Sequence, residues 1–87
     1  MTTHVIVLYF AKSAELTGVK EEELVAVPTP ISSLELWTLL LQRHPRLRLL
    51  QDQVVLAVRQ QYVAIGDQVL TLGDGDEVAV VPPLSGG

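Results

Sequence analysis

Residues 31–45 read ISSLELWTLLLQRHP, and they carry the most complete helix signal in the chain. Ser32 is followed three positions later by Glu35, which predicts a capping box in which each side chain bonds to the other residue's backbone N–H. Pro45 cannot continue a helix and therefore ends it at the preceding residue. Apolar side chains recur at helical spacing between these two ends, so one face of the helix needs a sheet to cover it. The residues of this face are Leu36, Trp37 and Leu40, with Leu34 and Leu41 widening it.

Short β-prone runs bounded by Gly, Pro and Asp lie on both sides of this helix. The expected strands are Val5–Phe10, Glu22–Val27, Val54–Arg59, Tyr62–Ala64 and Glu77–Val81. The first of them is almost wholly apolar, which is typical of a strand covered on both faces and central in its sheet. The remaining elements are a short helix or turn at Lys12–Leu16, ended by Gly18, and a short connection over residues 46–52.

This order of elements predicts an α+β fold, in which one main helix packs across a mixed four- or five-stranded sheet. The first and last strands are the most apolar, so we expect them side by side and parallel at the centre of the sheet. A chain of 87 residues can bury one core but not two. We therefore expect one domain over residues 1–81, followed by a flexible tail over residues 82–87.

The composition excludes several classes of function. Ten acidic against six basic residues give a net charge of −4, the opposite of the charge of a nucleic-acid-binding protein. The chain contains no cysteine, which excludes disulfides, a thiol nucleophile and cysteine-based metal sites. No apolar run approaches the ~20 residues that span a bilayer, and the first residues do not resemble a signal peptide. We expect a soluble cytosolic protein that binds neither nucleic acid nor membrane.

The charged residues offer no recognisable catalytic or metal site. Residues 21–23 are three successive glutamates, which cannot all face one ion in an extended chain and are interpreted as a solvated strand entrance. His4 and His44 stand apart from any triad or metal spacing, so exposed or helix-capping roles are expected. Residues 73–76 read GDGD, a turn rather than a calcium loop. A group of basic residues is either a solvated helix end or a local docking patch: Arg43, Arg46 and Arg48.

The last expected strand leads into the hexapeptide PPLSGG, residues 82–87. Pro82 and Pro83 cannot donate to a sheet ladder, so they close the strand and direct the following residues away from the domain. Gly86 and Gly87 have no side chain, which would allow the backbone to enter a narrow channel and leave the terminal carboxyl open to attack. Paired glycines also occur in frayed chain ends. The ordered series of strand, prolines, apolar residue, hydroxyl residue and glycines favours a reactive carboxyl at Gly87.

Three segments together resemble the small, sulfur-carrying subunit of molybdopterin synthase, a ubiquitin-like β-grasp family. They are LYFAKSAELTG at residues 8–18, AVRQQYV at residues 57–63 and GDEVAVVPPLSGG at residues 75–87. The glycine pair is shared by all ubiquitin-like carriers, whereas the acidic turn, strand, Pro-Pro, apolar, Ser, Gly-Gly series is more specific. Two positions depart from the family pattern: Val81 stands where an aromatic residue can occur, and Ala14 where bacterial relatives can carry arginine.

The resemblance implies that the chain carries sulfur and is a non-catalytic subunit. An ATP-dependent adenylating and sulfurtransferase enzyme of the ubiquitin-activating type would convert Gly87 to an acyl-adenylate and then to a thiocarboxylate. No cofactor would be bound, and ATP would be used only by this partner. The tail, with Leu84, Ser85 and Gly86, would then enter the large subunit of a heterotetramer, where the sulfur is transferred to cyclic pyranopterin monophosphate. Phe10, Val81 and Leu84 would dock both partners.

Other interpretations remain open from the sequence. The same activated glycine could be joined to lysines of target proteins, as in ubiquitin-like modifiers. The chain could instead be a passive β-grasp interaction module, or a sulfur carrier of the thiamine pathway, which the middle segment disfavours.

Overall fold

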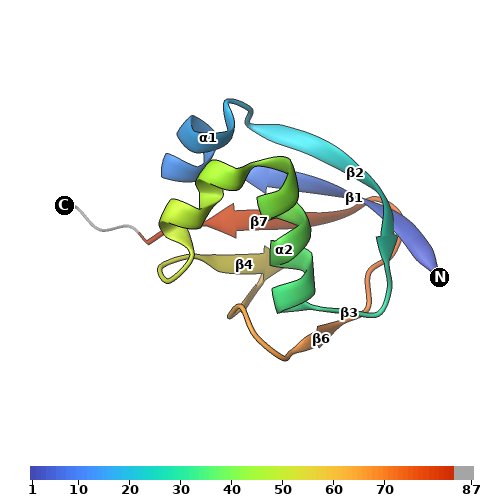
Figure 1. Cartoon of the computed structure of the whole chain (residues 1–87). Helices are drawn as coiled ribbons and strands as arrows, with labels where there is room; N and C mark the ends of the chain where they lie inside the picture. Colours follow the sequence, from blue (N-terminus) through green and yellow to red (C-terminus); the bar gives the residue numbers. More distant parts are fainter. Residues whose placement is uncertain (84–87) are drawn as a thin grey trace.

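The computed structural model describes residues 1–83, and the predicted tail residues Leu84, Ser85, Gly86 and Gly87 lie outside the described residues. The elements follow the order expected from the sequence (Figure 1). They are β1 (Thr2–Tyr9), α1 (Lys12–Thr17), β2 (Glu21–Pro28), β3 (Ile31–Ser32), α2 (Ser33–Arg43), the 3₁₀ helix η1 (Pro45–Leu50), β4 (Val55–Val58), β5 (Gln61–Val63), β6 (Val69–Leu70) and β7 (Asp76–Val81).

The main sheet has five strands in the order β2-β1-β7-β4-β5. β1 and β7 run parallel at its centre, where Val7 lies opposite Val78, and the other neighbouring strands are antiparallel. α2 crosses one face of the sheet (Figure 1). The predicted α+β fold with parallel first and last strands is therefore confirmed. A second ladder, formed by β3 and β6, was not predicted because each of its strands has only two residues.

The start of α2 and the end of α1 follow from local chemistry. The Ser32 hydroxyl accepts the Glu35 backbone N–H at 3.0 Å, and the Glu35 carboxylate accepts the Ser32 N–H at 3.2 Å, so the predicted capping box is confirmed. Gly18 ends α1 with a left-handed φ of 79°, and its N–H donates to the carbonyl oxygen of Ala14 at 2.9 Å. The residues 46–52 connection largely becomes η1.

The core lies between α2 and the sheet. Alternate residues of the central strands point toward the helix and are buried, and Trp37 is 1% exposed as a core residue. This layer contains Val5, Val7 and Tyr9 of β1, Leu56 and Val58 of β4, Val78 and Val80 of β7, and Leu36, Trp37 and Leu40 of α2. Leu70 and Leu72 are buried beside it.

Three predictions about individual positions were wrong. The expected strand at residues 5–10 is covered on one face only, because α2 packs on one side of the sheet and the described chain places no layer on the other. Leu34 does not join the core face, since it is 49% exposed on the outer side of α2. Arg59 is not in a strand, because it adopts a left-handed φ of 50° in the turn between β4 and β5.

Candidate functional site

The base of the tail is attached to the centre of the sheet. β7 delivers the chain to Pro82, which is buried, and Pro83, which is exposed, at the end of the molecule where α1 and η1 lie (Figure 1). The Val80 carbonyl oxygen accepts the Phe10 N–H at 3.4 Å and the Ser13 hydroxyl at 3.4 Å. The start of α1 therefore holds the last described residues close to the most buried strands.

The uncovered side of the sheet is apolar, and we call it the open face. Its residues alternate with the core residues and are half-buried or exposed: Ile6, Leu8 and Phe10 at β1, Ala79 and Val81 of β7, Val55 and Ala57 of β4, and Tyr62 of β5. Phe10 is 50% exposed and Tyr62 is 76% exposed. Large apolar side chains on a strand face are ordinarily buried. The open face therefore has the composition of a surface that a partner covers.

Two of the predicted docking residues, Phe10 and Val81, lie on the open face, whereas Leu84 falls outside the described residues. Sequence reasoning missed Tyr62. The structure places it there through its antiparallel pairing with Ala57, which puts both side chains on the same side of the sheet. Strand alternation alone could not show this, because β5 has only three residues.

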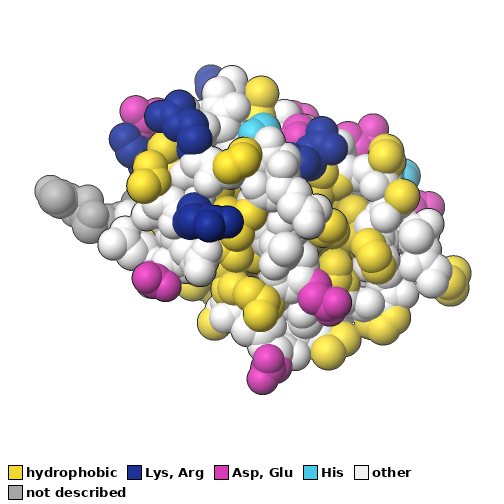
Figure 2. All heavy atoms as spheres, viewed as in Figure 1, with side chains coloured by type: hydrophobic (Ala, Val, Ile, Leu, Met, Phe, Trp, Pro, Cys, Tyr) yellow, Lys and Arg dark blue, Asp and Glu magenta, His cyan; other side chains and the backbone are white. Residues whose placement is uncertain are grey.

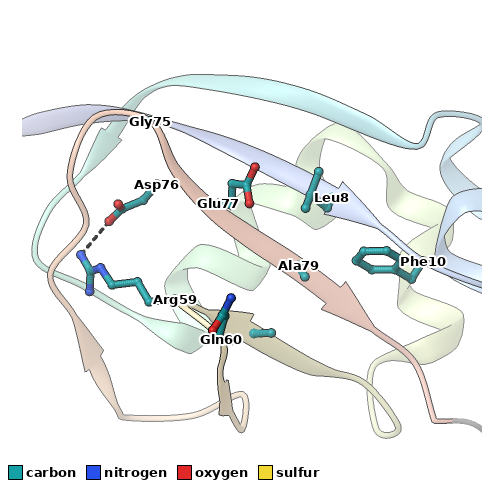
Figure 3. A pocket seen from close by; sticks show the side chains of 9 residues that line it. Leu8, Phe10, Arg59, Gln60, Gly75, Asp76, Glu77 and Ala79 are labelled. Atoms are coloured by element: carbon teal, nitrogen blue, oxygen red, sulfur yellow. Dashed lines mark hydrogen bonds and ion pairs between the residues drawn. The ribbon is translucent and has the colours of Figure 1, made fainter.

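Phe10 stands between two grooves on this face. One has a volume of about 590 Å³. Its apolar part is lined by Leu8, Phe10, Ala57 and Ala79, and its other end is polar (Figure 3). The other, of about 480 Å³, lies toward α1 and Ala14. An aromatic ring with a groove on either side can be enclosed by a partner, which is the setting in which single residues dominate binding energy.

The Arg59–Gln60 turn forms the polar end of the larger groove. Arg59 and Gln60 have φ values of 50° and 67°, a conformation that glycine ordinarily supplies. The Arg59 Nη2 donates to the Thr71 carbonyl oxygen and to Asp76 Oδ2, each at 2.6 Å, and Asp76 Oδ2 also accepts the Gly73 N–H at 2.8 Å. Arg59 therefore fixes the hairpin to the loop before β7 (Figure 3).

Carboxylates line the β2 side and the far end of the open face. Glu21 and Glu23 lie opposite Leu8 and Ile6, and Glu77 is exposed on β7. Here the interpretation of residues 21–23 as solvated is confirmed for Glu21 and Glu23. Next to this rim, His4 lies 3.7 Å from Glu23 and 3.3 Å from Asp74. Acidic side chains at this rim favour a partner with basic residues around an apolar centre.

Glu22, in contrast, points toward the core side, so its interpretation as a solvated residue was wrong. Its carboxylate accepts hydrogen bonds from the Tyr9 hydroxyl at 2.6 Å and Arg43 Nε at 3.0 Å, and His44 Nε2 lies 2.5 Å away. Burial acts to raise the pKa of Glu22, but the hydrogen bonds from Tyr9 and His44 outweigh it and lower that pKa. Burial, with the bond to Glu22, raises the pKa of Tyr9.

The sequence suggested that His44 stands apart from other charged groups, and this prediction was wrong. It caps the end of α2, since its N–H donates to the Leu40 carbonyl oxygen at 2.8 Å, and this confirms the capping role that was one of the two expected. Its ring also meets Tyr9 edge to face with a centroid distance of 5.5 Å. The cluster of Tyr9, Glu22, Arg43 and His44 joins three elements and has a structural role.

Within residues 1–83, no group of three or more His, Cys, Asp or Glu side chains is arranged to hold a metal ion. In the same range, none of the helices has the length and apolar character needed to cross a membrane.

Comparison with known proteins shows the family to which the chain belongs. The ThiS family profile matches residues 7–87. The human molybdopterin synthase sulfur carrier subunit is 56% identical over 81 residues, which cover 93% of this chain and 91% of the human protein. Among solved structures, molybdopterin converting factor subunit 1 from Pyrococcus furiosus aligns with a TM-score of 0.76 at 32% identity, covering 95% of this chain and all of that one. Small archaeal modifier protein 1 from Haloferax volcanii aligns with a TM-score of 0.75 at 25% identity, covering 97% and 99%. The chain belongs to the ThiS family of ubiquitin-like β-grasp proteins, within the group of molybdopterin synthase sulfur carrier subunits.

Proposed function

We propose that this protein carries sulfur on the carboxyl group of Gly87 for the synthesis of molybdopterin. The observation that supports this best is the position of the open face, which is apolar, uncovered and located at the base of the Gly-Gly tail. A carrier needs a surface by which enzymes recognise it and a reactive end that reaches their active sites. The name and 56% identity of the human relative point to the same role.

The proposed loading chemistry starts from a poor electrophile. An α-carboxylate has an ordinary pKa near 3.3–3.7 and is ionised at neutral pH. A carboxylate oxygen of Gly87 would attack the α-phosphorus of ATP on the adenylating enzyme, and pyrophosphate would leave. Sulfide-level sulfur from a donor would then attack the acyl carbon, and AMP would leave with the former carboxyl oxygen. The product is a thiocarboxylate, and no residue of this chain is oxidised or reduced.

The proposed transfer takes place in the large subunit of molybdopterin synthase. The thiocarboxylate sulfur would form a bond to a side-chain carbon of cyclic pyranopterin monophosphate as a carbon–oxygen bond at that carbon breaks, and the oxygen would leave on the phosphate or as water. Hydrolysis of the resulting thioester would return Gly87 to its carboxylate and leave the sulfur on the pterin. Since a dithiolene has two sulfurs, two loaded carriers are needed, in keeping with a heterotetramer of two small and two large subunits. The chain itself would supply the sulfur and the docking surface, while the catalytic groups come from the cytosolic partner enzymes.

The test is the intact mass of the protein after incubation with its adenylating enzyme, ATP and a sulfur donor. We expect one oxygen to be replaced by sulfur at Gly87, and we expect the loaded protein to support molybdopterin formation with the large subunit. Deletion of Gly87 should abolish both results and leave the thermal unfolding midpoint unchanged. Normal molybdopterin formation by the deletion variant would disprove the proposal.

A second candidate function is attachment to other proteins. It is favoured by the likeness to small archaeal modifier protein 1 from Haloferax volcanii, at 25% identity. In that case, Gly87 would be transferred to the amine of a target lysine with loss of AMP. Because Arg59 is the last Lys or Arg of the chain, trypsin would leave residues 60–87 attached to a modified lysine. Tryptic peptides in which a lysine bears this remnant would support attachment, and their absence after enrichment would leave sulfur transfer as the function.

A further inference from the structure

We propose that the helices α1 and η1 carry a cationic patch that docks on an acidic surface of the adenylating enzyme. The patch is Lys12, Lys20, Arg46 and Arg48, with Leu49 among them. This inference rests on the proposed function, because it concerns the partner that would load Gly87. It concerns a surface that adjoins the open face, since Lys20 lines the groove beside Phe10.

The first observation is that the cations of this acidic protein are divided into two groups. The chain has six Lys and Arg residues. Arg43 pairs with Glu22 at 3.0 Å and Arg59 pairs with Asp76 at 2.6 Å. Across the described residues, the four cations of the patch form no ion pair, and all four are exposed. A chain with ten acidic residues could have paired them at little cost.

The second observation is where these four residues lie. Lys12 begins α1 and Lys20 closely follows it, while Arg46 and Arg48 are on η1, and the two helices pack against each other. This is the end at which β7 delivers the chain to Pro82, and α1 bonds to the last strand through Ser13. Figure 2 shows Lys and Arg side chains gathered at this end of the molecule, beside the base of the tail.

A solvated helix end accounts for only two of the four cations, since Arg48 lies in the last turn of η1 and Lys20 follows the end of α1. Cations are favoured at the C-terminus of a helix and disfavoured at its N-terminus. Lys12 is the first residue of α1 and Arg46 the second of η1, so both stand where the helix dipole opposes a positive charge. Three carboxylates, those of Glu15, Glu21 and Asp52, also lie on or beside these helices, which leaves a local excess of one positive charge. The rest of the molecule then carries −5.

Leu49 gives the patch an apolar contact. It is 71% exposed on η1, whereas Leu47 and Leu50 of the same helix are buried. An exposed leucine on the same short helix as Arg46 and Arg48 is a combination found in protein interfaces, where charge guides the approach and an apolar side chain is desolvated. The complementary surface is therefore an acidic protein surface with an apolar depression.

The reach of the tail indicates which part of the enzyme this is. The four residues beyond Pro83 span at most about 14 Å when extended. Charges in solvent are screened over about 8 Å at physiological ionic strength. The patch would therefore act on the mouth of the channel that receives the tail, and not on the reacting carboxyl group.

We assign the adenylating enzyme as the partner of the patch because the complex of this protein with that enzyme must form and dissociate each time Gly87 is loaded with sulfur. A charged rim raises the association rate without the slow dissociation that more apolar area would add. In a lasting heterotetramer, the apolar open face would be the main source of affinity.

The test compares two double variants with the same change of net charge. Arg46→Gln with Arg48→Gln removes two charges from the patch, whereas Thr2→Glu with Gln68→Glu adds two negative charges at exposed positions, at the N-terminal start of β1 and just before β6, which lie away from α1 and η1 (Figure 1). We measure the rate of association with the adenylating enzyme by stopped flow from 20 mM to 1 M salt. The patch variant should associate roughly three- to tenfold more slowly at low salt and equal the unmodified protein at high salt. The control should change the rate less than twofold.

Three outcomes would overturn the proposal: equal slowing by both double variants, a rate for the unmodified protein that does not depend on salt, or slowing only with the large subunit. Unchanged circular dichroism and thermal midpoints would show that both variants fold. If the unmodified protein binds but never gains sulfur on Gly87, the proposed function fails, and the result for the patch still stands on the association rates.

Discussion

The Tyr9 hydroxyl donates a hydrogen bond of 2.6 Å to the Glu22 carboxylate and links β1 to β2 on the core side of the sheet. The same carboxylate accepts a hydrogen bond from Arg43 Nε and contacts the His44 ring, and both residues lie at the end of α2. Glu22 therefore attaches the end of the main helix to the edge strand of the sheet. A half-buried carboxylate with three partners of this kind is costly to remove, because the donors left behind lose their acceptor.

Replacement of Glu22 by Gln is expected to reduce the free energy of unfolding by about 1–3 kcal/mol at pH 7. The pKa of Glu22 is lowered in the folded protein. Its contribution to the free energy of unfolding is therefore complete above the ordinary pKa of a glutamate and is lost as pH falls through the lowered value. The difference between the unmodified protein and the variant should therefore shrink in acid. Urea unfolding at pH 7 and pH 3 measures this. Glu21→Gln, at the exposed neighbouring position, is the control and should cost less than 0.5 kcal/mol; an equal loss for both variants would contradict the assignment.

Phe10→Ala is expected to weaken binding to the large subunit by about 30-fold or more, the effect of losing an interface anchor worth about 2 kcal/mol. Because Phe10 is 50% exposed, the variant should unfold at nearly the same temperature. The matched control is Leu34→Ala, since Leu34 is 49% exposed on the other side of the molecule. Isothermal titration calorimetry measures both affinities. Similar losses for the two variants would show that the open face is not the docking surface.

Tyr62 is the open-face residue that only the structure revealed. Tyr62→Ala should weaken the same complex by roughly tenfold, because the ring extends the apolar surface formed with Ala57. Tyr62→Phe keeps the ring and should restore most of the affinity. If Tyr62→Phe were as damaging as Tyr62→Ala, the hydroxyl group rather than the ring would be the contact.

Gln60→Gly is expected to stabilise the protein by roughly 0.5–1 kcal/mol. Gln60 has a φ of 67°, where a side chain is strained and glycine is not. Gln61→Gly, one position later at the start of β5, should instead destabilise, because a strand residue gains backbone freedom in the unfolded state. Thermal unfolding measures both changes, and a lower midpoint for Gln60→Gly would mean that the Gln60 side chain makes contacts worth more than the strain.

Local signals predicted the elements well. The capping box at Ser32, the glycine at position 18 and the prolines at positions 45 and 82 mark boundaries through interactions within a few residues. The signals failed where a contact comes from far along the chain. Glu22 looked like its neighbours Glu21 and Glu23, and only the approach of Arg43 and His44 distinguishes it. His44 was misjudged for the same reason.

The sequence by itself determined the succession of strands and helices, because periodicity, caps and turn residues act over short distances. The parallel central pair could be predicted because the first and last strands are the most apolar. Only the tertiary structure decided which face of the sheet stays uncovered and that Phe10 and Tyr62 both lie on it. It also placed the four cations that form no ion pair within residues 1–83 on or just after α1 and η1. The physical reason is that one helix can cover only one side of a five-stranded sheet. Which side it covers depends on strand order and register, and these are fixed by contacts between residues that are distant in sequence.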